Sequence, residues 1–428
     1  HPPQTQVIPM AQTLYVYQGR QHIGILHDEH PLRFSYQPQW LQTGNAQPIA
    51  PAFPLQEGDF SGPTVTAFFE NLLPEGPVRR LLQASRHTST VFGLLRSVAG
   101  DTAGSLTLLP PGETPAPPAY QRTTWQHISQ QLRQGTAPAL GAPSQPDTRI
   151  SLAGAQTKLL LMIFPDGQPA FPLGAAPSSH ILKPDIQGLP GVWASALNET
   201  LVMNLAAVLG LGTAQAQYQP DTQACLIQRY DRHAEPNGSL TRLHQLDLCQ
   251  LAGVPSGTKY EADGGPSLAD CRRLLQDIGI PAKDLKRLVQ WIIFNLFVGN
   301  HDSHAKNLSV LATPHSWQLA PFYDLMCTTL YPGLARQFAF KIGNTNLPGQ
   351  IGVTQLRQLS HALGLTPGYV LQLAKELYHA LPSALDLVAH TLSDQTPAGT
   401  PHTLIQRLDQ KIRQESRKYA RRWEIEHH

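Results

Sequence analysis

The polar stretch from Asn300 to Asn307, together with the P-F-Y-D sequence at Pro321 to Asp324, holds the residue types best suited to chemistry. Seven polar or ionisable side chains fall within the first stretch, directly after a long apolar run. Such a density of polar groups is poor material for a core, because buried polar groups cost free energy unless they are hydrogen-bonded. We therefore predict a functional site here and treat the rest of the chain as the scaffold that positions it.

Phosphoryl transfer is one chemistry that these residue types could perform. It needs a carboxylate that orients a hydroxyl, oxygen ligands for Mg²⁺, a cation for the donor phosphates and a backbone loop over them. Asp302 could accept the hydroxyl proton, while Asn307 and Asp324 offer hard oxygen ligands. Lys183, at the end of a short apolar strand, could supply the cation. The small-residue loop Ser151 to Thr157 could cover the phosphates, because small side chains let backbone N–H groups approach an anion.

Two other interpretations of the same residues stay open on motif order alone. A metal hydrolase is the first, because His301, Asp302 and His304 could bind a transition metal. Catalytic zinc sites usually take three protein ligands with outer-shell support, and no H-E-x-x-H sequence stands nearby. The second is a noncatalytic binding protein in which the polar stretch only caps a helix. Motif order favours kinase-like transfer over both.

The first half of the chain predicts two units that contain β-strands. Alternation from Leu14 to Leu26 around Gly19 indicates a hairpin that opens a β-rich module over residues 10–110. Proline-rich and polar stretches then predict a linker region over residues 111–147. A loop followed by an apolar strand, a helix over residues 197–209 and a strand over residues 224–231 predict a small mixed lobe over residues 148–231.

The second half of the chain predicts a mostly helical lobe over residues 232–425. Apolar spacing over residues 284–297 indicates a buried helix that ends at Gly299, and leucine-rich segments continue the pattern over residues 354–391 and 403–425. Two short apolar segments between Asn307 and Asp324 predict a hairpin that returns Asp324 beside Asn307. The expected fold class is therefore α+β, with the site in a cleft between two lobes.

Composition narrows the functional classes. At 428 residues the chain is long enough for two or three packed units, and 41% hydrophobic residues indicate a globular protein. The formal net charge of +2 gives no electrostatic footprint for gripping nucleic acid alone. Four scattered cysteines predict neither a disulfide framework nor a zinc site, and favour a reducing, cytoplasmic setting. We expect neither a membrane span nor a signal peptide, and Met10 is a candidate natural start.

Eight ordered motifs resemble those of one known family. They are R-I-S-L-A-G-A-Q-T-K (149–158), H-I-L-K-P (180–184), N-E (198–199), R-Y-D-R (229–232), H-Q-L-D-L-C-Q (244–250), K-Y-E-A-D-G-G-P (259–266), G-N-H-D-S-H-A-K-N (299–307) and P-F-Y-D (321–324). Together they closely resemble the HipA family, the serine/threonine kinase toxins of bacterial HipBA toxin–antitoxin modules. The resemblance spans nearly the whole chain and implies a two-lobed protein-kinase-like fold with an additional N-terminal module.

The resemblance also assigns roles to individual residues, with ATP and Mg²⁺ as cofactors. By similarity Asp302 is the catalytic base, Asn307 and Asp324 hold Mg²⁺, and Ser151 matches an autophosphorylation site. Lys306 is a further candidate catalytic residue, because it could reach the transferred phosphoryl group. Gln228 stands where the family often has an acidic residue. The expected ATP-binding residues are Leu152, Ala153, Gly154, Ala155, Gln156, Thr157, Lys183, Gln228, Arg229, Tyr230 and His304.

Partners are implied in the same way. Members of the family that this chain resembles typically phosphorylate an aminoacyl-tRNA synthetase or another translation component and stop growth. A HipB-type helix-turn-helix antitoxin neutralises them and supplies the DNA contact, which suits the near-neutral charge of this chain. The alternative that keeps the fold is a catalytically silent regulator that binds such an antitoxin.

Overall fold

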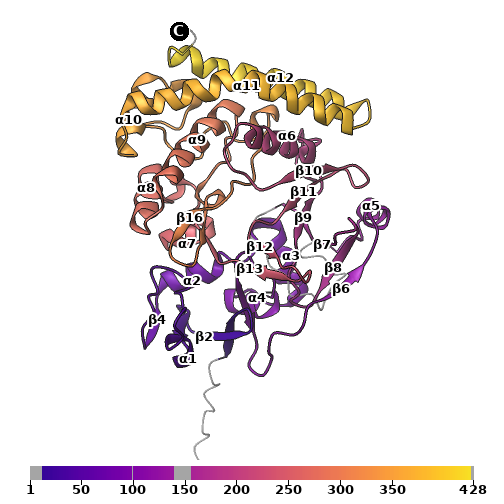
Figure 1. Ribbon diagram of the computed structural model, residues 1–428, viewed down its shortest axis with the longest axis vertical. Coiled ribbons are helices and arrows are strands. Elements are labelled where there is room, and N and C mark those ends of the chain that lie inside the picture. The colour runs from indigo at the N-terminus through magenta and orange to yellow at the C-terminus, as the bar shows by residue number, and fades with distance from the viewer. Residues whose placement is uncertain (1–11, 99, 139–155, 426–428) are drawn as a thin grey trace, which may run out of the picture.

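The computed structural model describes residues 12–98, 100–138 and 156–425. Figure 1 shows an N-terminal module at one end of the molecule, a small sheet-containing lobe at one side, and a layer of long helices at the opposite end. Most of the buried apolar side chains form one cluster that runs from the N-terminal module into the helices. A smaller cluster fills the interior of the small lobe. The α+β fold predicted from the sequence is therefore confirmed.

The N-terminal module is built on a five-stranded antiparallel sheet in the order β4-β3-β2-β1-β5. The predicted hairpin is confirmed: β1 pairs with β2, and Gly19 in the turn has a φ of 59°, which suits glycine. The strands are β1 (Thr13–Gln18), β2 (Gln21–His27), β3 (Arg33–Tyr36), β4 (Asp59–Ser61) and β5 (Leu106–Leu109). The helices are α1 (Pro38–Leu41), α2 (Pro63–Glu70), α3 (Gly76–Arg86) and α4 (Val91–Val98).

The small lobe contains a six-stranded sheet in the order β10-β11-β9-β7-β8-β6, and helix α6 packs against it. α6 covers most of the helix that the sequence predicted over residues 197–209, and most of its side chains are buried. The strands are β6 (Ala119–Arg122), β7 (Leu159–Ile163), β8 (Pro169–Leu173), β9 (His180–Lys183), β10 (Ala216–Gln219) and β11 (Ala224–Gln228). The helices are α5 (Trp125–Gln134) and α6 (Ser195–Val208).

The predicted linker over residues 111–147 needs a correction. Its residues 119–134 form β6, which pairs with β8, and α5, whose Ile128 is buried with Leu159 and Leu161 in the core of the small lobe. Thr124 caps α5 by accepting a hydrogen bond from the backbone of His127, so a helix begins despite the prolines nearby. Of the described residues of the predicted linker, those before β6 connect β5 to the small lobe.

The helical lobe surrounds α9 (Ala282–Val298), whose last two turns are buried on all sides. Gly299 ends α9 in the left-handed conformation, with a φ of 68°, as the sequence predicted. The other helices are α7 (Leu248–Ala252), α8 (Leu268–Asp277), α10 (Val353–Ala362), α11 (Pro367–Gln395) and α12 (Thr400–Arg422). Short 3₁₀ helices span Ser256–Thr258, Glu261–Asp263, Ala305–Asn307, Thr328–Leu330 and Pro348–Gln350.

Two small sheets complete this lobe. β14 (Gln245–Asp247), β15 (Ser309–Ala312) and β16 (Trp317–Leu319) form one, and β12 (Arg232–Ala234) and β13 (Leu240–Arg242) form the other. The β15–β16 pair is the hairpin predicted between Asn307 and Asp324. Of the helices in the described part of the chain, none is both long and apolar enough to cross a bilayer. All four cysteines are buried and free.

Candidate active site

Asp302 lies in the turn that follows α9, and backbone contacts hold it there. Its N–H donates to Oδ1 of Asn300 at 3.3 Å, and its carbonyl oxygen accepts a hydrogen bond from Nδ2 of Asn307 at 2.9 Å. The hydroxyl of Tyr260 donates to Oδ1 of the Asp302 carboxylate. The surrounding protein shields the Asp302 carboxylate from water, and this loss of hydration raises its pKa above the ordinary value. The hydrogen bond from Tyr260 opposes that rise. An exposed carboxylate held in this way is suited to accept a proton.

The second carboxylate, Asp324, lies in an unusual backbone conformation. Its φ is 54°, in the left-handed region that side chains rarely adopt, although aspartate tolerates it better than most residues. The β15–β16 hairpin brings the chain back here, and the negative charge of Asp324 is one of the influences that raise the pKa of Asp302. Asp324 therefore lies close enough to influence Asp302. The hairpin was predicted from the sequence, and the placement of Asp324 beside Asn307 stays a prediction.

Lys183, at the end of β9, bridges two carboxylates from different elements. Its ammonium lies 2.8 Å from Oε1 of Glu199 on α6 and also contacts Oδ1 of Asp324. Burial opposes the charge on Lys183, but Asp324 and Glu199 outweigh burial and raise its pKa, so the lysine stays cationic. Burial raises the pKa of Glu199, and the ammonium opposes this rise. The cation of the small lobe is thereby tied to the carboxylate that follows the hairpin.

Asn307 and Asp324 carry oxygen atoms of the kind that Mg²⁺ prefers. The side chain of Asp324 is 43% exposed while that of Lys183 is 7% exposed, so part of the carboxylate is accessible to a cation. Nδ2 of Asn307 is used by the Asp302 carbonyl, which leaves Oδ1 as the atom that could bind a cation. Mg²⁺ is typically bound by one or two such ligands plus water and substrate phosphates.

Lys306 is placed differently from its predicted role. Its ammonium donates to Oδ2 of Asp247 at 2.6 Å, to Oδ1 of Asn71 at 2.8 Å and to the carbonyl of Asn71 at 3.0 Å. These three acceptors use all three N–H groups of the ammonium. Contact with a transferred phosphoryl group would require Lys306 to give up at least one of them, so the geometry supports a positioning role.

The two histidines beside Asp302 point to different neighbours. Nδ1 of His301 lies 3.1 Å from the carbonyl of Ala335, and the ring packs edge-on against Phe338. His304 packs edge-on against the ring of Tyr260, and burial lowers its pKa well below the usual range, so the ring is neutral. Among the described residues no group of three His, Cys, Asp or Glu side chains is placed to hold a metal ion. The hydrolase interpretation therefore lacks the ligand set it was built on.

The predicted hinge segment separates into residues with different surroundings. Gln228 is exposed at the end of β11, and the ring of Tyr230 stacks on Tyr323 with centroids 5.9 Å apart. The guanidinium of Arg229 is buried, where it binds Asp101 at 3.1 Å and Asp231 at 2.9 Å. Since Asp101 belongs to the N-terminal module, the Arg229 side chain joins that module to the hinge, and only its backbone is left to face a nucleotide.

Five residues of the predicted phosphate loop, Ser151, Leu152, Ala153, Gly154 and Ala155, lie outside the described residues. The end of the loop is described: Nε2 of Gln156 donates to the carbonyl of Pro184 at 3.3 Å, and Thr157 is exposed. Because Pro184 follows Lys183 directly, the end of the loop lies beside the lysine strand. Lys158 comes next, and its burial, with the nearby charge of Lys183, lowers its pKa to about 8.

Sequence reasoning assigned no role to two side chains that contact the candidate site residues. Glu199 was named only within the N-E motif (198–199), although a glutamate among the apolar residues of a predicted helix signals a buried partner. Tyr260 lies 42 residues before Asp302 in the chain. No pattern between these two positions indicates that their side chains meet.

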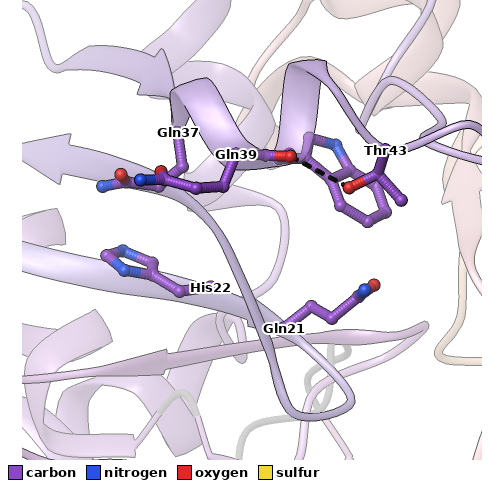
Figure 2. A pocket seen from close by; sticks show the side chains of 6 residues that line it. Gln21, His22, Gln37, Gln39 and Thr43 are labelled. Carbon is purple, nitrogen blue, oxygen red and sulfur yellow. Dashed lines mark hydrogen bonds between the residues drawn. The ribbon is translucent and has the colours of Figure 1, made fainter.

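A separate cavity lies in the N-terminal module. Its volume is about 410 Å³. Figure 2 shows the side chains that line it, which come from β2 and from α1 with its flanking residues: Gln21, His22, Gln37, Gln39, Trp40 and Thr43. All these residues come from the N-terminal module, whereas the Asp302 site is built from the small and helical lobes. The cavity is therefore not part of the cleft around Asp302.

Two segments of the chain match models of known protein families. Residues 150–385 match the HipA-like C-terminal domain, and residues 14–109 match the HipA N-terminal domain. The chain belongs to the HipA family. It is 37% identical over 329 residues to the "Putative kinase Y4mE" of Sinorhizobium fredii (strain NBRC 101917 / NGR234), covering 74% of this chain and 77% of that one.

Two further comparisons concern HipA of Shewanella oneidensis. The chain is 29% identical over 372 residues to a serine/threonine-protein kinase toxin HipA of that organism, covering 82% of each protein. It also matches a solved structure of the S. oneidensis MR-1 toxin–antitoxin system of HipA, HipB and operator DNA, with a TM-score of 0.82, 26% identity, and coverage of 95% and 97% of the two chains. The kinase-like fold is thus confirmed, and the chain is a serine/threonine-protein kinase by class.

Proposed function

We propose that this HipA-family kinase transfers the γ-phosphoryl group of ATP to a serine or threonine hydroxyl of a protein, and that Asp302 is the general base. The observation that carries the proposal is that Lys183 bridges Glu199 and Asp324. Asp324 is also near enough to Asp302 for its charge to raise the pKa of Asp302. A lysine–glutamate pair and a metal-binding aspartate are both required in place for protein-kinase chemistry. This arrangement joins strand β9, helix α6 and the segment after β16 in one cleft.

Each side chain has a separate task in this mechanism. Oδ2 of Asp302 accepts the proton of the substrate hydroxyl, since Oδ1 is occupied by the hydroxyl of Tyr260. Lys183 would hold the phosphates of ATP, and Asn307 and Asp324 would hold Mg²⁺. When bound, Mg²⁺ neutralises charge on the phosphate oxygens. The loop Leu152 to Thr157, of which the structure describes Gln156 and Thr157, would cover the phosphates, as the family resemblance implies.

The adenine side of the nucleotide would lie against the segment Gln228 to Tyr230. Gln228 and Tyr230 would contact the base, and Arg229 would contribute its backbone, because its guanidinium is held by Asp101 and Asp231. His304 is neutral and lies beside Tyr260, so it contributes to the shape of the site without adding charge. Lys306 positions the loop that carries Asn307.

The biological role follows from the family and its relatives. We propose that the protein is the toxin of a bacterial toxin–antitoxin pair, acts in the cytoplasm, and phosphorylates an aminoacyl-tRNA synthetase or another translation component. A HipB-type helix-turn-helix antitoxin would be its partner, and DNA would be reached only through that partner. The S. oneidensis complex of HipA, HipB and operator DNA supports this assembly.

The experiment that tests this function combines activity with substrate identity. The purified protein is incubated with ATP, Mg²⁺ and a cell lysate, and phosphorylated sites are identified by mass spectrometry. We expect new phosphoserine or phosphothreonine on a translation component, and none with an Asp302→Asn variant. Toxicity that persists in Asp302→Asn would instead favour a catalytically silent regulator.

Autophosphorylation at Ser151 is proposed as the off-switch. A phosphate there adds about −1.5 to −2 charges beside a loop that must cradle another phosphate, so repulsion would expel the loop and stop turnover. We expect mass spectrometry to find phosphate on Ser151 after incubation with ATP, and the phosphorylated form to lose ATP binding. An unmodified Ser151, or undiminished ATP binding by the phosphorylated form, would contradict the switch.

A further inference from the structure

The turn between α2 and α3 reaches from the N-terminal module into the catalytic loop. Asn71 ends α2, and its Nδ2 donates to the carbonyls of Ala67 at 2.8 Å and Val254 at 2.9 Å. These two hydrogen bonds fix the amide plane, so that Oδ1 faces Lys306 at 2.8 Å. The backbone carbonyl of Asn71 accepts from the same ammonium at 3.0 Å. One residue of the module thus supplies two of the three acceptors of Lys306.

Lys306 in turn holds the part of the loop that binds the other site residues. It lies in the 3₁₀ turn Ala305–Asn307, its carbonyl accepts a hydrogen bond from Tyr323 at 2.8 Å, and Asn307 follows it directly. The amide of Asn307 then holds the backbone of Asp302. The Lys306 side chain is only 4% exposed, and a buried cation that loses its partners is strongly destabilised. Asn71 therefore acts on Asn307 and Asp302 through Lys306.

The same turn contacts the loop from its other side through Glu75. Oε1 of Glu75 lies 2.9 Å from the ammonium of Lys259. The carbonyl of Lys259 accepts the N–H of Ala305 at 3.4 Å, and the next residue, Tyr260, donates to the carboxylate of Asp302. Both contacts depend on residues 71–75, a segment of five residues far from the catalytic loop in sequence.

We propose that the α2–α3 turn is a positioning element of the active site, in which Asn71 and Glu75 set the catalytic loop from two sides. The N-terminal module is then required for the chemical step itself. This inference rests on the proposed function, because it assigns the turn to the loop that carries Asp302. Neither Asn71 nor Glu75 touches the reacting atoms; both act through other residues.

The test uses the full-length protein and separates kcat from KM. We expect Asn71→Ala and Glu75→Gln to lower kcat about 10-fold to 100-fold, since small misplacements of catalytic groups have effects of this size, while the KM for ATP changes less than about 2-fold. Asn71→Asp keeps an oxygen acceptor for Lys306 but loses the two hydrogen bonds that Nδ2 donates to Ala67 and Val254, so it should restore only part of kcat. Gln47→Ala is the matched control, because Gln47 joins the same module to the β15–β16 turn through the carbonyl of Thr313 at 3.2 Å.

Amide hydrogen exchange of residues 300–308 gives a readout that does not need activity. We expect faster exchange there in Asn71→Ala and Glu75→Gln than in wild type or Gln47→Ala. Unchanged exchange, together with kcat equal to that of the control, would overturn the inference. If the wild-type protein transfers no phosphate at all, the proposed function fails, and the exchange rates alone decide whether the turn positions the loop.

Discussion

The ammonium of Lys183 on β9 lies 2.8 Å from Oε1 of Glu199 on α6, and both side chains are nearly inaccessible to solvent. The same ammonium contacts Asp324, which follows the β15–β16 hairpin. A single cation therefore connects a strand and a helix of the small lobe to the helical lobe. In the proposed mechanism, this connection holds Lys183, which binds the phosphates, next to Asp324, which binds the metal ion.

Loss of the Glu199 charge should impair use of ATP. Of the two carboxylates beside the ammonium of Lys183, only Asp324 remains in Glu199→Gln, so we expect the lysine to be drawn away from the phosphates and to compete with Mg²⁺ for that carboxylate. We expect kcat/KM for ATP to fall about 10-fold to 100-fold. Glu415→Gln is the control, since Glu415 is also buried and bound by lysines, but on α12. Equal kinetics for the two variants would contradict this role of Glu199.

Removal of the Tyr260 hydroxyl should slow the chemical step. In Tyr260→Phe the carboxylate of Asp302 loses its donor and its fixed orientation, and a hydrogen bond to a charged group is worth enough to change kcat about 10-fold. Steady-state kinetics with saturating ATP measures the change. Tyr120→Phe, which removes a hydroxyl bound to the carbonyl of Pro177, should leave kcat unaltered. A Tyr260→Phe enzyme with wild-type kcat would show that this contact is not used.

Replacement of Asp324 should change the dependence on Mg²⁺. Asp324→Asn removes the charge of one of the two expected metal ligands, so we expect the half-maximal Mg²⁺ concentration to rise about 10-fold or more. A Mg²⁺ titration of phosphate transfer measures it. Asp221→Asn, an exposed site in the turn between β10 and β11, serves as the control. An unchanged Mg²⁺ dependence would place the metal elsewhere.

Stability should fall with acid partly through His180. Burial lowers the pKa of His180 to about 4 in the folded protein, below the ordinary value of 6.5. The unfolded chain therefore binds more protons between these values, so the contribution of His180 to stability is complete above pH 6.5 and is lost as pH falls toward 4. Thermal unfolding at several pH values should show a smaller loss for His180→Gln than for wild type. Identical pH dependence would show that His180 does not titrate as described.

Local patterns predicted the elements that carry the site. The period of two from Leu14 to Leu26 indicated the first hairpin, and the helical spacing before Gly299 indicated α9. Two short apolar runs were enough to predict that Asp324 returns toward Asn307. These features depend on neighbouring residues in the chain, so a single sequence contains them.

Contacts between distant modules could not be predicted in the same way. Lys306 meets Asn71 across 235 positions in the sequence, and the position of its ammonium depends on how the N-terminal module packs on the catalytic loop. The ion pair of Arg229 could not be predicted for the same reason, because its partner Asp101 belongs to that module. The predicted linker was too long, because its prolines suggested an extended chain and the pattern did not reveal the strand β6 and the capped helix α5 that follow them. In each case tertiary packing, rather than local sequence, determines the outcome.

The role of Asp302 as the base of a phosphoryl transfer can be measured with a single charge-removing substitution. Wild type and Asp302→Asn are compared for transfer of labelled phosphate from ATP to protein, and ATP binding is measured separately. The control is Asp277→Asn, which changes an exposed residue at the end of α8. We expect Asp302→Asn to retain ATP binding and to lose transfer by about 100-fold or more, while the control transfers normally. Transfer by Asp302→Asn at the rate of the control would contradict this role of Asp302 and the mechanism built on it.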